Sequence, residues 1–261
     1  MAEIDRRRLL TSGLAISGGI ALGVGGAAPA QAAPRVGRVL ASGLAVPWGL
    51  TFLPNGNALV GERNSGDVFL VRRGGGKKRI GSIPAKNIAG GEGGLLGLAL
   101  HPDFAANRLL YVYVSTGSDN RIVRCRYADG KLGRREVVLA GIPMNSHHNG
   151  GALVFGPDRL LYASTGDAEV GARAQSRSSL GGKVLRLTPA GEVPSGNPFG
   201  NYTWSYGHRN VEGLAFDARG GLWATEFGEK ETDELNRIVP GANYGWPNAE
   251  GSDGGGGYKD P

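Results

Sequence analysis

Cysteine is almost absent from this chain of 261 residues: Cys125 stands alone, which excludes an intramolecular disulfide. Long apolar runs are also missing, because the apolar stretch over residues 13–28 is short and weak for a membrane span of about 20 residues. No Pro/Ser-rich linker or block of charge divides the sequence, and no long segment has a convincing helical period. We therefore expect one large domain that is low in helix and stabilised by burial alone.

Charge of one sign is not concentrated anywhere. The formal net charge is +6, but the 29 lysines and arginines are spread along the chain instead of clustering with aromatic residues. A nucleic-acid groove needs such a cluster, so we expect no nucleic-acid partner. A basic pocket for a small anion stays compatible with this distribution.

The N-terminal residues predict a targeting signal. Arg6-Arg7-Arg8-Leu9-Leu10 precedes the Gly/Ala-rich stretch, and Ala30-Gln31-Ala32 is a small-x-small cleavage pattern. We interpret residues 1–32 as a twin-arginine signal peptide and expect a secreted, cell-surface or periplasmic protein that begins near Ala33. An N-terminal membrane anchor is the alternative. Residues 33–261 would then form a single domain.

One unit recurs in the rest of the chain: an apolar strand, usually led by glycine, a polar turn with Pro, Asp or Gly, and a second apolar strand. Its copies begin at Gly49, Gly97, Ala152 and Gly213. A further strand follows in each copy, at residues 68–71, 122–127, 184–187 and 235–239. Repeats of roughly 40 to 60 residues made of short strands are typical of β-propeller blades. We therefore predict an all-β propeller with about four blades.

The residues just before the inner strands are candidates for a ligand site, because these loops meet at one rim of a propeller's channel. They include Glu92, the pair His147-His148, and His208-Arg209-Asn210. Histidine is scarce, with four in the chain, and two of them stand together beside glycines that let the backbone bend around a ligand.

Seven motifs carry a resemblance to a known family. They are, in chain order, Val46-Pro47-Trp48-Gly49, Glu92-Gly93-Gly94-Leu95-Leu96-Gly97, His101-Pro102-Asp103-Phe104, His148-Asn149-Gly150-Gly151, Thr165-Gly166-Asp167, Gly207-His208-Arg209-Asn210 and Asn243-Tyr244-Gly245-Trp246-Pro247-Asn248. With these motifs the chain resembles the glucose/sorbosone dehydrogenase family, soluble aldose sugar dehydrogenases that use pyrroloquinoline quinone (PQQ). The resemblance implies a six-bladed propeller of four-stranded sheets. Because the four copies match the first four blades, we expect the chain to be truncated at its C-terminus, without the later blades that hold most of the family's cofactor-binding Lys and Arg.

The resemblance also implies roles for individual residues. His148 matches the general base beside the cofactor, which takes the proton of the sugar's anomeric hydroxyl while hydride passes to the quinone. Asp167 matches the acid that would fix the tautomer of this histidine, although a Gly-Asp pair is also an ordinary turn. Arg209 and Asn210 match residues that contact the quinone oxygens. Glu92 lies where some relatives carry a glutamine that contacts a sugar hydroxyl.

Calcium is the other ligand that the resemblance implies. The carbonyls of Gly228 and Glu229 match the positions that hold the ion near the quinone, although relatives can have Gly-Pro where this chain has Gly-Glu. Asp233, Glu234 and Tyr244 match a second, structural calcium site by position. The acidic run over residues 229–234 is equally compatible with a solvated loop.

The resulting hypothesis is an oxidoreductase that oxidises aldose sugars at the anomeric carbon to lactones, with PQQ, calcium and an external electron acceptor. Two other classes stay open: a calcium-dependent propeller lactonase, and a non-catalytic extracellular propeller that binds through its rim. A homodimer also stays open.

Overall fold

The computed structural model describes residues 37–88, 90–252 and 257–261. The predicted signal peptide, residues 1–32, and its cleavage site near Ala33 lie outside the described residues. The chain separates into a short unit, Met1–Arg38, and a second unit, Val39–Pro261, which carries all the described strands. The account below concerns the second unit.

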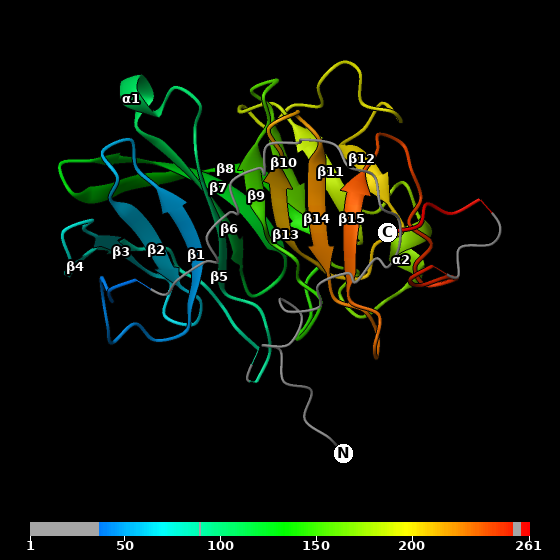
Figure 1. Cartoon of the computed structure of the whole chain (residues 1–261), viewed down its shortest axis with the longest axis horizontal. Coiled ribbons are helices and arrows are strands. Elements are labelled where there is room, and N and C mark those ends of the chain that lie inside the picture. The colour runs from blue at the N-terminus through cyan, green and yellow to red at the C-terminus, as the bar shows by residue number, and fades with distance from the viewer. Residues whose placement is uncertain (1–36, 89, 253–256) are drawn as a thin grey trace, which may run out of the picture. The chain divides into compact units, whose positions relative to one another are not determined.

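Val39–Pro261 consists of four antiparallel sheets that follow one another along the chain (Figure 1). Their strands, in chain order, are β1 (Pro47–Phe52), β2 (Ala58–Glu62), β3 (Asp67–Val71) and β4 (Lys77–Ser82); β5 (Leu95–Leu100), β6 (Leu109–Ser115), β7 (Asn120–Ala128) and β8 (Lys131–Ile142); β9 (Leu153–Phe155), β10 (Leu161–Ser164), β11 (Lys183–Leu187) and β12 (Thr203–Tyr206); and β13 (Val211–Phe216), β14 (Leu222–Glu226) and β15 (Glu234–Ile238). Each sheet pairs its strands in sequence order, as a propeller blade does. The prediction of an all-β propeller with about four blades is confirmed.

Helix is minor in the described residues. It consists of two single turns, α1 (Phe104–Asn107) and α2 (Ala172–Gln175). None of the described helices is long and apolar enough to cross a membrane.

Three apolar clusters stabilise the blades, and each lies between two neighbouring sheets. Leu59 of β2 packs with Leu110 of β6, Tyr113 of β6 with Leu161 of β10, and Val184 of β11 with Leu222 of β14. Side chains of the middle strands are buried because both faces of each inner sheet are covered. Full burial of one such side chain is worth about 1.5–3 kcal/mol, which explains why the strands are rich in Leu and Val.

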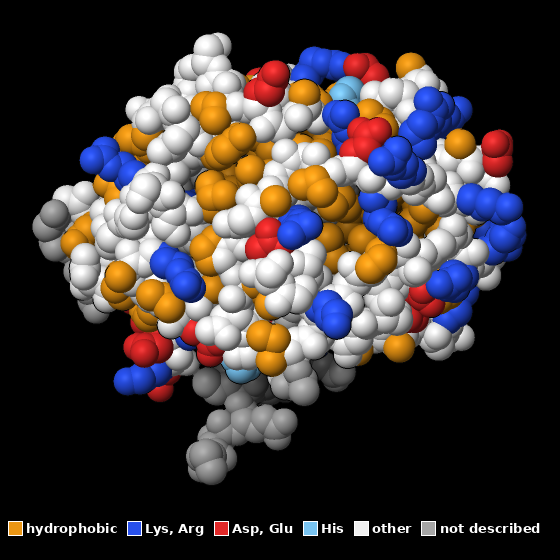
Figure 2. Space-filling view, turned by 180° about the vertical axis from the view of Figure 1, so that it is seen from behind, with side chains coloured by type: hydrophobic (Ala, Val, Ile, Leu, Met, Phe, Trp, Pro, Cys, Tyr) orange, Lys and Arg blue, Asp and Glu red, His pale blue; other side chains and the backbone are white. Residues whose placement is uncertain are grey.

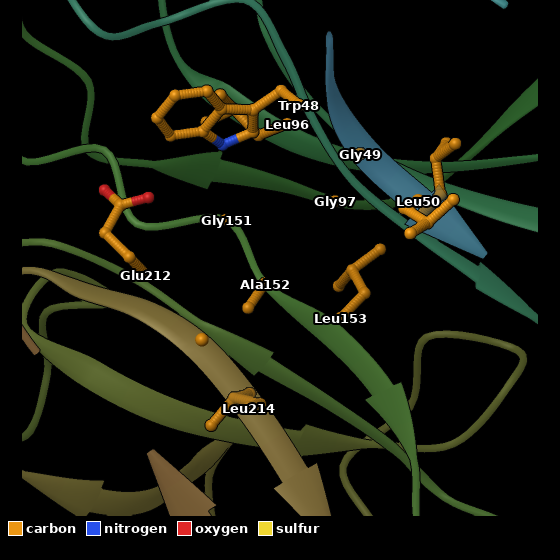
Figure 3. A pocket seen from close by; sticks show the side chains of 12 residues that line it. Trp48, Gly49, Leu50, Leu96, Gly97, Gly151, Ala152, Leu153, Glu212 and Leu214 are labelled. Carbon is orange, nitrogen blue, oxygen red and sulfur yellow. The ribbon is translucent and has the colours of Figure 1, made fainter. Parts of the chain in front are cut away.

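The innermost strands β1, β5, β9 and β13 are neighbours in that order and line a cavity of about 260 Å³. Figure 3 shows this cavity between strands of all four sheets. The glycines that lead these strands have a steric role: a Cβ on Gly97 would lie 2.1 Å from the carbonyl oxygen of Gly151. Glycine therefore lets neighbouring blades approach closely at the channel.

The surface agrees with the dispersed charge of the sequence. On the face seen in Figure 2, lysine and arginine side chains are interspersed with acidic and apolar ones.

Candidate active site

The loop that precedes β9 carries His148 in an unusual backbone conformation. Its φ is +56°, in the left-handed region that non-glycine residues seldom adopt. Two side chains from other blades hold the loop: the His148 N–H donates to Oε2 of Glu92 (2.8 Å), and the Gly150 N–H donates to Oδ1 of Asn210 (2.9 Å). Gly166 leaves room for it, since a Cβ there would lie 2.0 Å from the carbonyl oxygen of His148. The loop is thus fixed by residues of three blades.

The imidazole of His148 is paired with Asp167. Nδ1 of His148 lies 2.8 Å from Oδ1 of Asp167, and the side chains are 17% and 2% exposed. Burial raises the pKa of Asp167, but hydrogen bonds from His148 and Trp246 outweigh it, so the pKa of Asp167 lies below its ordinary value. An ionised carboxylate only accepts hydrogen bonds, so Nδ1 of His148 is the donor, and in the neutral ring the lone pair is on Nε2. This arrangement suits a general base.

Trp246 has a part in the site that the sequence analysis did not assign. Its indole N–H donates to Oδ2 of Asp167 at 2.7 Å, and its ring lies 5.3 Å from the guanidinium carbon of Arg209. One aromatic side chain therefore orients the carboxylate behind His148 and stacks against a cation. Trp246 belongs to a quoted motif, but no local signal shows that its partner is 79 residues away.

Arg209 is hydrogen-bonded at its backbone and at the tip of its guanidinium group. Its Nη1 donates to the carbonyl oxygen of Phe227 (3.2 Å), and its backbone N–H donates to the carboxylate of Glu226. Nε is buried and has no hydrogen-bond partner among the described residues. A buried donor without a protein partner is rare, and a water, an ion or a ligand is the usual partner of such a group.

Glu212 is a second residue that the sequence analysis missed. Its Oε1 accepts a hydrogen bond from Nδ2 of Asn210 (3.0 Å), and its side chain extends toward the end of the cavity where Trp48 lies (Figure 3). Burial and, to a smaller extent, the charge of Glu92 raise the pKa of Glu212 to about 7. A signal existed: Glu212 is two residues after Asn210, so both side chains project from the same face, and it is the only carboxylate on an otherwise apolar inner strand.

The remaining histidines contribute less. The His147 side chain is 47% exposed, and its Nδ1 lies 3.2 Å from Oε1 of Glu169. His208 is fully buried between Glu226 and Ser205 and stacks on Tyr244, as expected of a structural residue.

The five residues predicted to bind calcium fall in one region. Gly228, Glu234 and Tyr244 line a small cavity together with Glu226 and Glu250. The Tyr244 hydroxyl already donates to the carbonyl oxygen of Arg237 (2.6 Å) and accepts from the Val239 N–H (2.9 Å). Burial raises the pKa of Glu234.

The other two predicted residues, Glu229 and Asp233, lie in the loop beside this cavity. Asp233 accepts a hydrogen bond from the Gly228 N–H (3.2 Å). The carbonyls of Gly228 and Glu229 accept no hydrogen bond within the described part of the chain, so their oxygens can serve a hard cation. No group of three His, Cys, Asp or Glu side chains in the described ranges is arranged to hold a metal. The calcium sites stay predictions.

The fold and the site together define a propeller with a His–Asp pair and an arginine at one rim of its channel. Residues 44–259 match the sequence model of the family described as Glucose / Sorbosone dehydrogenase, so the chain belongs to this family. Two relatives are quinoprotein glucose dehydrogenase B of Acinetobacter calcoaceticus and the aldose sugar dehydrogenase YliI of Escherichia coli, strain K12. They are both 34% identical, over 85% and 80% of this chain and 53% and 61% of their own lengths.

Solved structures agree with the fold. The PQQ-bound form of the aldose sugar dehydrogenase from Streptomyces coelicolor superimposes with a TM-score of 0.84 and is 49% identical, over 87% of this chain and 70% of that one. The apo-form of the soluble aldose sugar dehydrogenase from Escherichia coli has a TM-score of 0.77 at 32% identity, over 86% of this chain and 73% of that one. The chain thus spans little more than half the length of the curated relatives it matches.

Proposed function

We propose that this chain carries the proton-transfer half of a PQQ-dependent aldose sugar dehydrogenase. The observation that supports it is the His148–Asp167–Trp246 array, whose Trp246 ring lies against the guanidinium of Arg209. The names of the relatives and the PQQ-bound form of the Streptomyces coelicolor enzyme support the substrate class and the cofactor.

His148 is the proposed base. Nε2 accepts the proton of the sugar's anomeric hydroxyl, and the carbon–oxygen bond becomes the carbonyl of a lactone as the hydride leaves the same carbon. Asp167 stabilises the imidazolium that forms and keeps the ring in place. PQQ, when bound, supplies the quinone that accepts the hydride and its two electrons, which an external acceptor later removes.

The residues around His148 would hold the sugar and polarise the quinone. Arg209 presents a fixed positive charge with an unused N–H, which fits the carbonyl oxygens of a quinone. Asn210 has one amide hydrogen left after its bond to Glu212. Glu92 uses Oε2 to hold the histidine loop, so Oε1 is the oxygen that would accept a sugar hydroxyl. Calcium would bind at the carbonyls of Gly228 and Glu229 and add positive charge at this rim.

The export of the enzyme and its oligomeric state are also part of the proposal. The arginine and leucine motif at the N-terminus supports export by the twin-arginine route. A homodimer is the assembly we propose to test by sedimentation velocity.

Substitutions at two neighbouring histidines test the proposed function. With PQQ, calcium and a reducible dye, His148→Ala should lower kcat for aldoses by roughly 10²- to 10⁴-fold, because proton transfer loses its base. His147→Ala is the matched control and should stay near the wild-type rate, since His147 lies outside the array.

Three outcomes would contradict the proposal, and two of them favour another class of protein. Equal rates in the two variants would contradict the role of His148. Sugar or glycan binding that survives His148→Ala in a protein with no dye reduction would favour a binding propeller. Lactone hydrolysis without cofactor would favour a lactonase.

A further inference from the structure

Lys183 is a buried cation without a carboxylate partner. It begins β11, its side chain is 0% exposed, and no ion pair to it is present among the described residues. Burial lowers the pKa of Lys183 to about 7. A buried ammonium is costly unless its hydrogens are satisfied, so its presence here needs a reason.

Three backbone carbonyls surround the amine. Nζ donates to the oxygens of Arg173 (2.8 Å), Ala174 (3.0 Å) and Gly181 (2.7 Å). An ammonium has three hydrogens, and these acceptors use all of them. Arg173 and Ala174 belong to α2, and their carbonyls also accept from the N–H groups of Ser176 (3.2 Å) and Gly207 (3.0 Å). The cation therefore joins both ends of the segment 173–181 to the start of β11.

That segment touches the two residues that orient His148. Nη1 of Arg173 donates to the carbonyl oxygens of Asp167 (3.2 Å) and Ala168 (3.0 Å). Nε2 of Gln175 donates to the carbonyl oxygen of Trp246 (2.7 Å). The backbones of both Asp167 and Trp246 are thus held by side chains that α2 carries.

We infer that Lys183 is a positioning residue: its ammonium holds the α2 segment so that Arg173 and Gln175 set Asp167 and Trp246 around His148. The placement follows from hydrogen bonds that join α2 to the start of β11 and to the backbones of Asp167 and Trp246. Only its consequence for turnover rests on the proposed function.

Hydrogen–deuterium exchange of the full chain, without cofactor or substrate, tests the placement. Lys183→Met keeps the length of the side chain, leaves the Gly181 carbonyl without a donor and removes one of the two donors to the carbonyls of Arg173 and Ala174. We expect exchange over residues 168–182 to rise roughly tenfold or more, with the amides of β5 and β6 unchanged. Lys131→Met, at an exposed lysine, is the control and should change neither region. A folded Lys183→Met variant with wild-type exchange over 168–182 would overturn the inference.

A second variant decides the matter where Lys183→Met does not fold. Arg173→Met leaves the three carbonyls in place and removes only the link to Asp167 and Ala168. We expect faster exchange confined to residues 167–169 and, in the dehydrogenase assay, a lower kcat with little change in KM. Wild-type exchange at 167–169 would overturn the link. Because exchange needs no turnover, a dehydrogenase assay that contradicts the proposed function would leave this result standing.

Discussion

Trp246 is the residue whose single hydrogen bond is most open to test. Phenylalanine keeps an aromatic face for Arg209 but cannot donate to Asp167. A hydrogen bond to a charged group is worth about 1.5–3 kcal/mol, so Trp246→Phe should lower kcat by roughly 10- to 100-fold in steady-state kinetics. Trp223→Phe is the matched control, because the Trp223 indole donates to the exposed Asp217 at 2.8 Å. Equal effects of the two substitutions would show that the bond to Asp167 is not special.

Glu212 predicts a pH dependence of stability. Its pKa is about 7 in the folded chain and near 4.5 when unfolded, so folding favours the protonated form. The contribution of Glu212 is fully present below pH 4.5 and is lost as the pH rises through 7. Glutamine resembles the protonated form. Glu212→Gln should therefore match the wild type at low pH and exceed its free energy of unfolding by about 1–3 kcal/mol above pH 7.

Urea denaturation at pH 5 and pH 8 measures this difference. Glu192→Gln, at an exposed carboxylate, is the control. Its free energy of unfolding should differ from that of the wild type by the same amount at both pH values. A gap between Glu212→Gln and wild type that is the same at both pH values would contradict the assignment.

Strands were predictable from the sequence where they consist largely of apolar residues. The inner strands and the third strand of each sheet, such as β7 and β11, carry apolar runs that mark them. The outermost strands β4, β8 and β12 escaped the analysis. β4 has the sequence KKRIGS, and β8 is largely exposed. The outermost strand lies at the edge of its blade, where one of its faces stays in contact with solvent. Its composition therefore resembles that of a loop.

The candidate site was predictable to the extent that it lies in loops next to repeated strands. His148, Glu92 and Asn210 precede inner strands, and the structure brings them together through hydrogen bonds across blades. Two of the residues that were missed, Trp246 and Lys183, act on partners that no local pattern indicates. Trp246 follows the fourth sheet, and Lys183 has the apolar neighbours of an ordinary core strand. Only tertiary structure shows which carbonyls or carboxylates such residues meet.

At the scale of the whole molecule, calcium should act as a stabilising ligand. The free carbonyls of Gly228 and Glu229 and the nearby carboxylate of Glu234 are oxygen donors of the kind that Ca²⁺ prefers. A ligand that binds only the folded chain stabilises it by about 2.7 kcal/mol at 100 times its Kd. For a domain of this size we expect Tm to rise by roughly 5 to 10 °C, and EDTA to reverse the rise.

Two comparisons separate this site from general ion effects. Mg²⁺ demands a smaller and more regular shell, so it should raise Tm less than Ca²⁺ at the same concentration. Glu234→Gln should weaken the calcium-dependent rise, because Glu234 lines the cavity. Glu231→Gln, an exposed position in the same acidic run, should leave it intact. Differential scanning calorimetry measures Tm of the wild type with Ca²⁺ or Mg²⁺, and of each variant with and without Ca²⁺. If both substitutions reduced the rise equally, the acidic run would attract calcium only as a diffuse charge, and the cavity beside Arg209 would not be the metal site.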